Sequence, residues 1–224
     1  MARKTREEAQ ATREGILDAA LACFHANGVA GTTLAAIGER AGYTRGAVYW
    51  HFRNKTEVLE AVIDRERIPF IERLRRTTSP QRNTPIPDLR SALLVSFAEV
   101  ESDACLRCMM EIMLRNDLSA ESQAMQQRQP ESSREELEIF AGAFARAHEL
   151  GQLRDHVDVA TAARTLHTSL MGVLYSAMLE PTLFDLCREG AETLDVVFGA
   201  YVREGVFTPG APPAPLPEGS TPER

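Results

Sequence analysis

The chain has 224 residues, of which 44% are hydrophobic and 25% charged, and this composition is ordinary for a globular protein with a small domain and a larger one. No stretch approaches the ~20 apolar residues of a membrane span, and the charged start MARKTREEAQ lacks the apolar core of a signal peptide. Four cysteines are too few for a disulfide scaffold, so we expect a cytoplasmic protein that does not contact the membrane.

Charge is distributed unevenly along the chain. Residues 1–76 carry 13 Lys and Arg against 10 Asp and Glu, a balance of +3, whereas the other 148 residues carry 12 against 22, a balance of −10. A mildly basic first part on an acidic body fits a protein whose first part alone contacts a polyanion. The excess is small, so charge by itself does not establish DNA binding.

The first part of the chain reads as three helices. Apolar residues at three- and four-residue spacing predict a helix from Glu7 to Asn27. A second helix is expected over Leu34–Ala41 with Thr33 as its N-cap, and a third from Thr44 to Phe52. A turn at Gly42 joins the two short helices, so the pattern predicts a helix-turn-helix unit, whose second helix enters the DNA major groove.

The helix expected from Thr44 to Phe52 has the side chains of a DNA-reading helix. Val48 and Phe52 are four residues apart and share the face that anchors it. The outer face carries Thr, Arg, Tyr and His, which bond phosphates and base edges, instead of the Glu and Lys of an ordinary amphipathic surface helix. Gly46 is a poor helix former that would let DNA approach the backbone closely. An ordinary surface helix is the alternative interpretation.

Helical patterns continue through the rest of the chain. A fourth helix is expected over Lys55–Arg76, in which Pro69 either introduces a kink or begins a separate helix. Residues 77–87 have the composition of a loop. Further helices are expected at Asp88–Ser102, Asp103–Arg115, Ser119–Leu150, Val157–Leu179 and Leu183–Glu204.

The predicted architecture is all-α, with about nine helices and no convincing strand pattern. Six of the 12 prolines fall between Pro209 and Pro222, which indicates a disordered tail. We therefore expect a helix-turn-helix DNA-binding domain at residues 1–55, a helical ligand-binding and dimerisation domain at 56–207, and a disordered tail at 208–224.

Two stretches carry a resemblance to a known family. The run GVAGTTLAAIGERAGYTRGAVYWHFRNKTEVLEAVI and the leader MARKTREEAQATREGILDAA resemble the TetR/AcrR family of bacterial repressors. The similarity covers roughly residues 5–65. Beyond these residues, the resemblance rests on length, helix count and weaker similarities such as ERIPF and GVLYSAMLEP. Within the family, it is strongest to repressors of multidrug efflux operons.

The resemblance implies a homodimer that binds a near-palindromic operator and releases it when a small hydrophobic ligand occupies the body. DNA-bound chains would then lie at the nucleoid. Carried over by position, the DNA-binding residues form one set: Thr33, Thr44, Tyr49, His51 and Lys55 on phosphates, Arg45 and Gly46 on base edges, and Trp50 beside them. The chemistry of arginine agrees with the role given to Arg45, because its planar guanidinium can donate hydrogen bonds to guanine O6 and N7 at the same time.

Apolar and polar residues of the body are candidates for a ligand site. Methionine adapts its shape and is frequent at promiscuous binding surfaces, and a ligand cavity is mostly apolar with a few polar fixing points. The candidate residues are Phe70, Leu93, Ser96, Phe97, Met109, Met113, Phe140, Phe144, His167 and Met171. For each, the alternative is that it is simply part of the core. The last two helices are apolar over more than one face and contain small residues, so we expect them to pair with their copy in a four-helix dimer interface.

No catalytic or metal-binding pattern stands out, and we expect neither enzyme activity nor a cofactor. Cys105 and Cys108 form a CxxC without the further ligands that zinc needs, so packing is the first interpretation and a thiol sensor the second. Two other functions stay open. One is a repressor of a metabolic operon that responds to a specific metabolite, and the other is a helical enzyme or interaction module without a DNA target.

Overall fold

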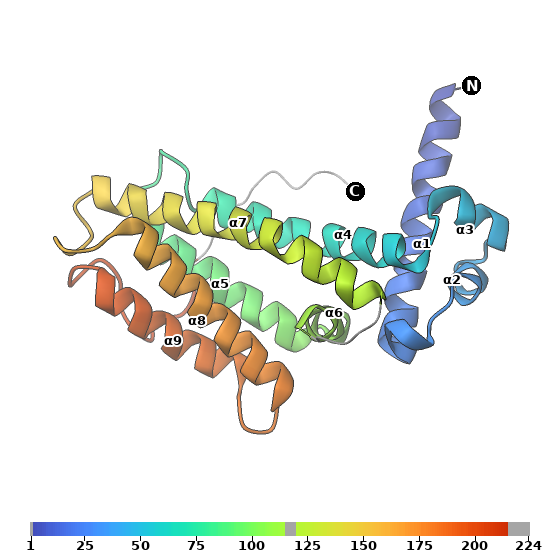
Figure 1. The fold of residues 1–224 in the computed structure, drawn as a ribbon. Coiled ribbons are helices and arrows are strands. Elements are labelled where there is room, and N and C mark those ends of the chain that lie inside the picture. Colours follow the sequence, from blue (N-terminus) through green and yellow to red (C-terminus); the bar gives the residue numbers. More distant parts are fainter. Residues whose placement is uncertain (1, 115–119, 215–224) are drawn as a thin grey trace. The chain divides into compact units, whose positions relative to one another are not determined.

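The computed structural model describes residues 2–114 and 120–214, and its regular elements within these ranges are α-helices (Figure 1). They are α1 Ala2–Gly31, α2 Leu34–Ala41, α3 Arg45–His51, α4 Lys55–Arg76, α5 Pro85–Ser102, α6 Ala104–Leu114, α7 Ala120–Glu149, α8 Val159–Leu179 and α9 Leu186–Tyr201. One isolated antiparallel bridge joins Leu153 and Val202. The all-α prediction with about nine helices is confirmed. None of the helices in these ranges is long and apolar enough to cross a bilayer.

The chain folds into two compact units. The first comprises Met1–Ile68 and Asp103–Pro130, and the second comprises Pro69–Ser102 and the chain from Glu131 on. Helices α4 and α7 pass from one unit to the other, and each carries a proline at the passage, Pro69 and Pro130. Proline removes a backbone donor from a helix. Helix α4 nevertheless continues through Pro69, so the alternative of a separate helix beginning there is not found.

The two compact units do not divide the chain at residue 55, where the DNA-binding domain was expected to end. The first half of α4 contributes buried Val58 and Leu59 to the same apolar cluster as α1, and α6 contributes Met109. The separation into a DNA-binding and a ligand-binding part is a statement about function, and it stays a prediction.

Helix α1 runs past its expected end. Gly28 has φ 69°, a left-handed conformation that breaks the helix at the predicted stop, after which the chain makes one more turn. The buried Thr32 hydroxyl lies 2.7 Å from the carbonyl oxygen of Gly28 and 3.2 Å from that of Cys23. These contacts fix the segment that leads into α2.

The first unit has one apolar core beneath its short helices. Side chains from five helices meet in it, because each helix presents an apolar stripe at helical spacing. The core members that are at most 1% exposed are Ile16, Leu17, Ala20, Phe24, Ile37, Val48, Val58, Leu59 and Val62.

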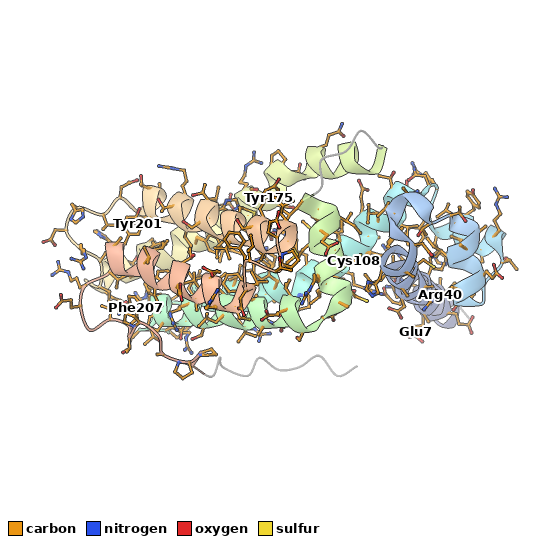
Figure 2. All side chains as sticks on the ribbon, turned by 90° about the horizontal axis from the view of Figure 1, so that it is seen from below. Glu7, Arg40, Cys108, Tyr175, Tyr201 and Phe207 are labelled. Carbon is orange, nitrogen blue, oxygen red and sulfur yellow. The ribbon has the colours of Figure 1, made fainter. Side chains whose placement is uncertain are left out.

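The second unit is built around α5, α8 and α9. Helix α9 packs against both of the others. The ring of Phe144 lies 6.1 Å from that of Phe198 and 6.2 Å from that of Tyr201, measured between centroids. Figure 2 shows Tyr201 and Phe207 on this unit, and Phe207 in turn packs edge-on against Phe198.

Two helix starts lie later than expected because aspartates cap them. The side chain of Asp158 accepts a hydrogen bond from the backbone N–H of Thr161, so α8 begins at Val159. Asp185 accepts one from Arg188 in the same way, so α9 begins at Leu186. The expected boundaries at residues 115 and 119 lie outside the described residues.

Residues 208–214 are held against the second unit. The guanidinium of Arg90, almost fully buried, donates to Asp195 Oδ1 at 2.6 Å and to the carbonyl oxygen of Ala211 at 2.7 Å. The backbone N–H of Gly210 donates to the other oxygen of Asp195, and that of Ala214 to the Ser91 hydroxyl. The structure thus differs from the expected disorder for residues 208–214, and residues 215–224 lie outside the described part.

Close packing of α5 on α9 makes Gly190 sensitive to substitution. A Cβ at Gly190 would overlap the ring of Phe97, which is 3% exposed and cannot move freely. We expect Gly190→Ala to lower the free energy of unfolding by ~1–3 kcal/mol through overpacking. Thermal or denaturant unfolding measures this. Gly199→Ala is the matched control on the same helix, because a Cβ there meets nothing within 4 Å. Equal stability of both variants would contradict the packing described.

Candidate nucleic-acid interface

A tight turn sets the angle between α2 and α3. Gly42 has φ 72° and donates its backbone N–H to the Glu39 carbonyl at 3.1 Å, while Tyr43 donates to the Gly38 carbonyl at 2.9 Å. This is the left-handed helix ending that glycine favours. A Cβ at Gly38 would lie 3.0 Å from Val48 Cγ2 and 3.2 Å from the carbonyl oxygen of Tyr43, so the two helices meet closely there. The predicted helix-turn-helix geometry is present.

The two candidate threonines at the helix starts act as caps. Thr33 Oγ accepts from Ala36 N–H at 3.1 Å, and Thr44 Oγ accepts from Ala47 N–H at 3.2 Å. Such caps satisfy backbone donors that have no partner within the helix. Both threonines are exposed, and each hydroxyl still has its own proton to donate to a phosphate oxygen.

Helix α3 has one buried and one exposed face. Val48 and Phe52 are 0% and 3% exposed, as predicted for its anchors, whereas Tyr49 and Trp50 are 45% and 74% exposed. The guanidinium of Arg45 lies 5.2 Å from the centroid of the Tyr49 ring, and one of its nitrogens donates to the Tyr49 hydroxyl at 3.3 Å. Stacking of this kind orders an arginine that is otherwise exposed.

Gly46 leaves open space on α3. A Cβ there would meet only Thr44 Oγ1, at 3.9 Å. The packing of this unit therefore does not require glycine at this position. The open backbone fits the predicted close approach of DNA.

His51 ends α3 in a partly buried setting. Its ring packs edge-on against Trp50, with centroids 4.5 Å apart. Burial, followed by the positive charge of Arg13, lowers the pKa of His51 below its ordinary value. The imidazole of the free protein is thus predominantly neutral at pH 7, with one N–H to donate.

Lys55 braces the end of α1. Its Nζ donates to the carbonyl oxygen of Val29 at 2.7 Å, directly after the break at Gly28. The sequence predicted a phosphate contact for Lys55 and did not predict this one. An ammonium has three donors, so both roles are compatible in the same side chain.

The ten candidate ligand residues fall in both units. Met109 and Met113 belong to the first unit, where Met109 is buried and Met113 packs against the same cluster. In the second unit, the buried core includes Leu93, Phe97, Phe140 and Phe144, with Phe70 packed against it. Met171 is half-buried on α8. These burials fit a core role for most of the set, and the ligand role stays a prediction.

The two polar candidates in the second unit differ in their hydrogen bonding. The Ser96 hydroxyl donates to the Ala92 carbonyl at 2.8 Å and accepts from Arg73 at 2.8 Å. His167 Nε2 is buried and forms no hydrogen bond within the described residues, although it lies 3.4 Å from Glu136 Oε2. His167 is therefore the polar group that a ligand would satisfy most readily.

Two cysteines lie in environments that disfavour the reactive thiolate. Burial, then the negative charges of Asp103 and Glu66, raises the pKa of Cys105. Burial and a hydrogen bond with Glu101 raise the pKa of Cys187 to about 12. Of these two, only Cys105 belongs to the CxxC, and its raised pKa favours packing over a thiol sensor. Among the described residues, no group of three or more His, Cys, Asp or Glu side chains is arranged to hold a metal.

Comparison with known proteins matches these features to a regulator family. A model of the bacterial regulatory proteins of the tetR family matches residues 16–62, from within α1 into α4. The HTH-type transcriptional regulator TtgR of Pseudomonas putida is 35% identical over 198 residues, which cover 87% of this chain and 93% of TtgR. The regulator AcrR of Shigella flexneri is 29% identical over 205 residues, covering 90% of this chain and 94% of AcrR.

Solved structures agree with the sequence matches. A complex of SmeT with triclosan is 54% identical, covers 93% of this chain and 100% of its own, and superposes with a TM-score of 0.87. A second structure of SmeT, the repressor of the Stenotrophomonas maltophilia multidrug efflux pump SmeDEF, gives 54% identity and a TM-score of 0.84 over 93% of this chain and 99% of its own.

The position of Lys55 predicts a double effect of its removal. Lys55→Met deletes the hydrogen bond to Val29, so we expect a loss of ~0.5–1.5 kcal/mol in the free energy of unfolding together with weaker DNA binding. Denaturant unfolding and a DNA titration at fixed salt measure the two effects. Arg53→Met is the control for stability, because Arg53 is 89% exposed on its side chain and its ion pair with Glu57 is at the surface. Unchanged stability of Lys55→Met would show that the contact contributes nothing.

Proposed function

Because the chain belongs to the TetR family of bacterial transcriptional repressors, we propose that it represses a multidrug efflux operon as a homodimer and leaves its operator when a small hydrophobic ligand binds. The observation that carries this proposal is the 54% identity to SmeT across 93% of the chain, which includes the second unit as well as the helix-turn-helix. SmeT represses an efflux pump and has been solved with triclosan.

The exposed face of α3 supports the DNA-binding part of the proposal. Arg45 stacks on Tyr49 at the N-terminal end of the helix, the end whose residues contact base edges in helix-turn-helix proteins. His51, at the other end of α3, and Lys55, at the start of α4, provide further donors. Thr33 and Thr44 add hydroxyl groups to the set. Arg45 is thus the candidate for base edges, and the hydroxyl, imidazole and ammonium groups are the candidates for phosphates.

The second unit supports the ligand-binding part. Its core is rich in aromatic rings, and Phe140 lies 6.4 Å from the ring of His167, measured between centroids. The unsatisfied Nε2 of His167 offers a polar fixing point to a phenol or another hydrophobic ligand with one hydrogen-bonding group. Such a ligand shifts the repressor away from DNA only by the difference between its affinities for the two conformations.

Exposed apolar side chains support a dimer through α8, α9 and the loop between them. Tyr175, which Figure 2 labels, is 51% exposed, Leu179 61%, Leu183 68% and Val196 73%. Large apolar groups gathered on one pair of helices mark an interaction surface. A copy of the same pair would cover them in a four-helix arrangement with twofold symmetry.

A titration with Arg45 variants tests the proposed repressor. Wild-type protein should bind DNA upstream of an adjacent transporter operon with two chains per site and release it on addition of triclosan. Arg45→Ala and Arg45→Lys should both weaken operator binding by ~1–3 kcal/mol more than binding to random DNA, because lysine keeps the charge and loses the fork. Fluorescence anisotropy at fixed salt measures both.

Several outcomes of that titration would contradict the proposal. Equal losses on operator and random DNA would exclude base reading by Arg45. Release by one polar metabolite and not by triclosan would favour the repressor of a metabolic operon. Absence of binding to any upstream fragment would favour the alternative of a helical enzyme or interaction module.

A further inference from the structure

Arg13 of α1 lies against the C-terminal end of α3. Its guanidinium carbon is 5.3 Å from the centroid of the Phe52 ring, in cation–π geometry. Phe52 is 3% exposed and is the C-cap residue of α3, so it offers Arg13 a fixed surface. The side chain of Arg13 is still 37% exposed. The arginine is thus positioned by the unit and open to solvent.

The Phe52 ring that Arg13 covers lies 6.3 Å from the ring of His51, measured between centroids, so Arg13 and His51 are near each other. The charge of Arg13 is the second cause, after burial, of the lowered pKa of His51. A permanent cation from α1 and a ring N–H from α3 therefore share one end of the recognition helix. That end lies opposite Arg45, which begins the helix.

Within the described part of the chain, Arg13 has only a loose acidic neighbour. This is Glu14, whose Oε1 lies 3.8 Å from Arg13 Nη1, close to the limit of an ion pair. Glu14 has other partners: Gln10 donates to its Oε1 at 2.6 Å, and Arg65 to its Oε2 at 3.4 Å. Most of the bonding capacity of Glu14 is therefore directed elsewhere, and Arg13 keeps donors for an external anion.

We propose that Arg13 and His51 together bind one backbone phosphate of the operator, at the flank of the bases read by α3. The proposal rests on DNA binding by the exposed face of α3. Helix-turn-helix proteins contact base edges with the N-terminal residues of the recognition helix, so groups at the other end meet the sugar-phosphate backbone. The guanidinium fork and the imidazole N–H match the oxygens of a phosphate, and an α1 residue thereby fixes the register of the helix on DNA.

Salt-dependent binding separates this role from a structural one. Each neutralised phosphate contributes about 0.9 to the slope of log affinity against log salt. Arg13→Gln should lower this slope by roughly 1 and weaken operator and random DNA alike, on the order of tenfold. Arg13→Lys should restore most of the slope, since it keeps the charge. Anisotropy titrations of the full chain over a salt series, with thermal unfolding of each variant, provide the readout.

Arg75→Gln is the matched control for loss of one positive charge. Arg75 lies on α4 in the second unit, is 61% exposed on its side chain and pairs with Glu135. Its slope should equal that of the wild type. A slope and affinity of Arg13→Gln equal to those of Arg75→Gln would overturn the proposal while leaving the repressor function intact. Loss on the operator alone would make Arg13 a base-reading residue and would also overturn it. Failure of the wild type to bind any DNA would overturn the proposed function itself.

Discussion

The close contact between α2 and α3 at Gly38 is the constraint on which the DNA-binding face depends. A Cβ at position 38 would lie 3.0 Å from Val48 Cγ2, so glycine lets Val48 pack tightly against the α2 backbone. The left-handed Gly42 turns the chain between the two helices, and buried Val48 and Phe52 fix the inner face of α3. Because these contacts fix the buried face, the opposite face of α3 exposes Arg45, Tyr49 and Trp50. The side chains that α3 exposes are thus determined by the packing of Gly38, Gly42, Val48 and Phe52.

Near the C-terminal end of α3, the same side chains contribute to packing and are candidates for DNA binding. Lys55 holds the end of α1 through Val29, and Arg13 rests on the buried ring of Phe52. These contacts order both side chains in the free protein, which would lower the entropy cost of the proposed DNA contacts. In the second unit, His167 differs from these residues, because its buried Nε2 has no hydrogen bond in the described part of the chain. This buried nitrogen is the group that the proposed ligand would satisfy.

Local patterns predicted what local interactions determine. The helix periods, the Thr33 cap and the anchors of α3 all depend on residues within about one turn of each other, and the structure has them. The contact of Lys55 with Val29 spans 26 positions, and the buried pair of Arg90 with Asp195 spans 105. No spacing rule encodes such pairs. The candidate ligand residues come from both units for the same reason. The spacing of the methionines on α6 also fits a ligand pocket, but in the structure these methionines pack in the cluster that includes α1.

The single tryptophan of the chain gives the most direct test of the central claim, that the exposed face of α3 is the surface that binds the operator. Trp50 is 74% exposed on that face, so its fluorescence in the free protein should be quenched efficiently by acrylamide. Saturating operator DNA should protect Trp50 from the quencher, and a ligand that releases the operator should restore its accessibility. If Trp50 stayed fully accessible in a complex whose formation a gel shift demonstrates, DNA would be bound elsewhere and the account would be wrong.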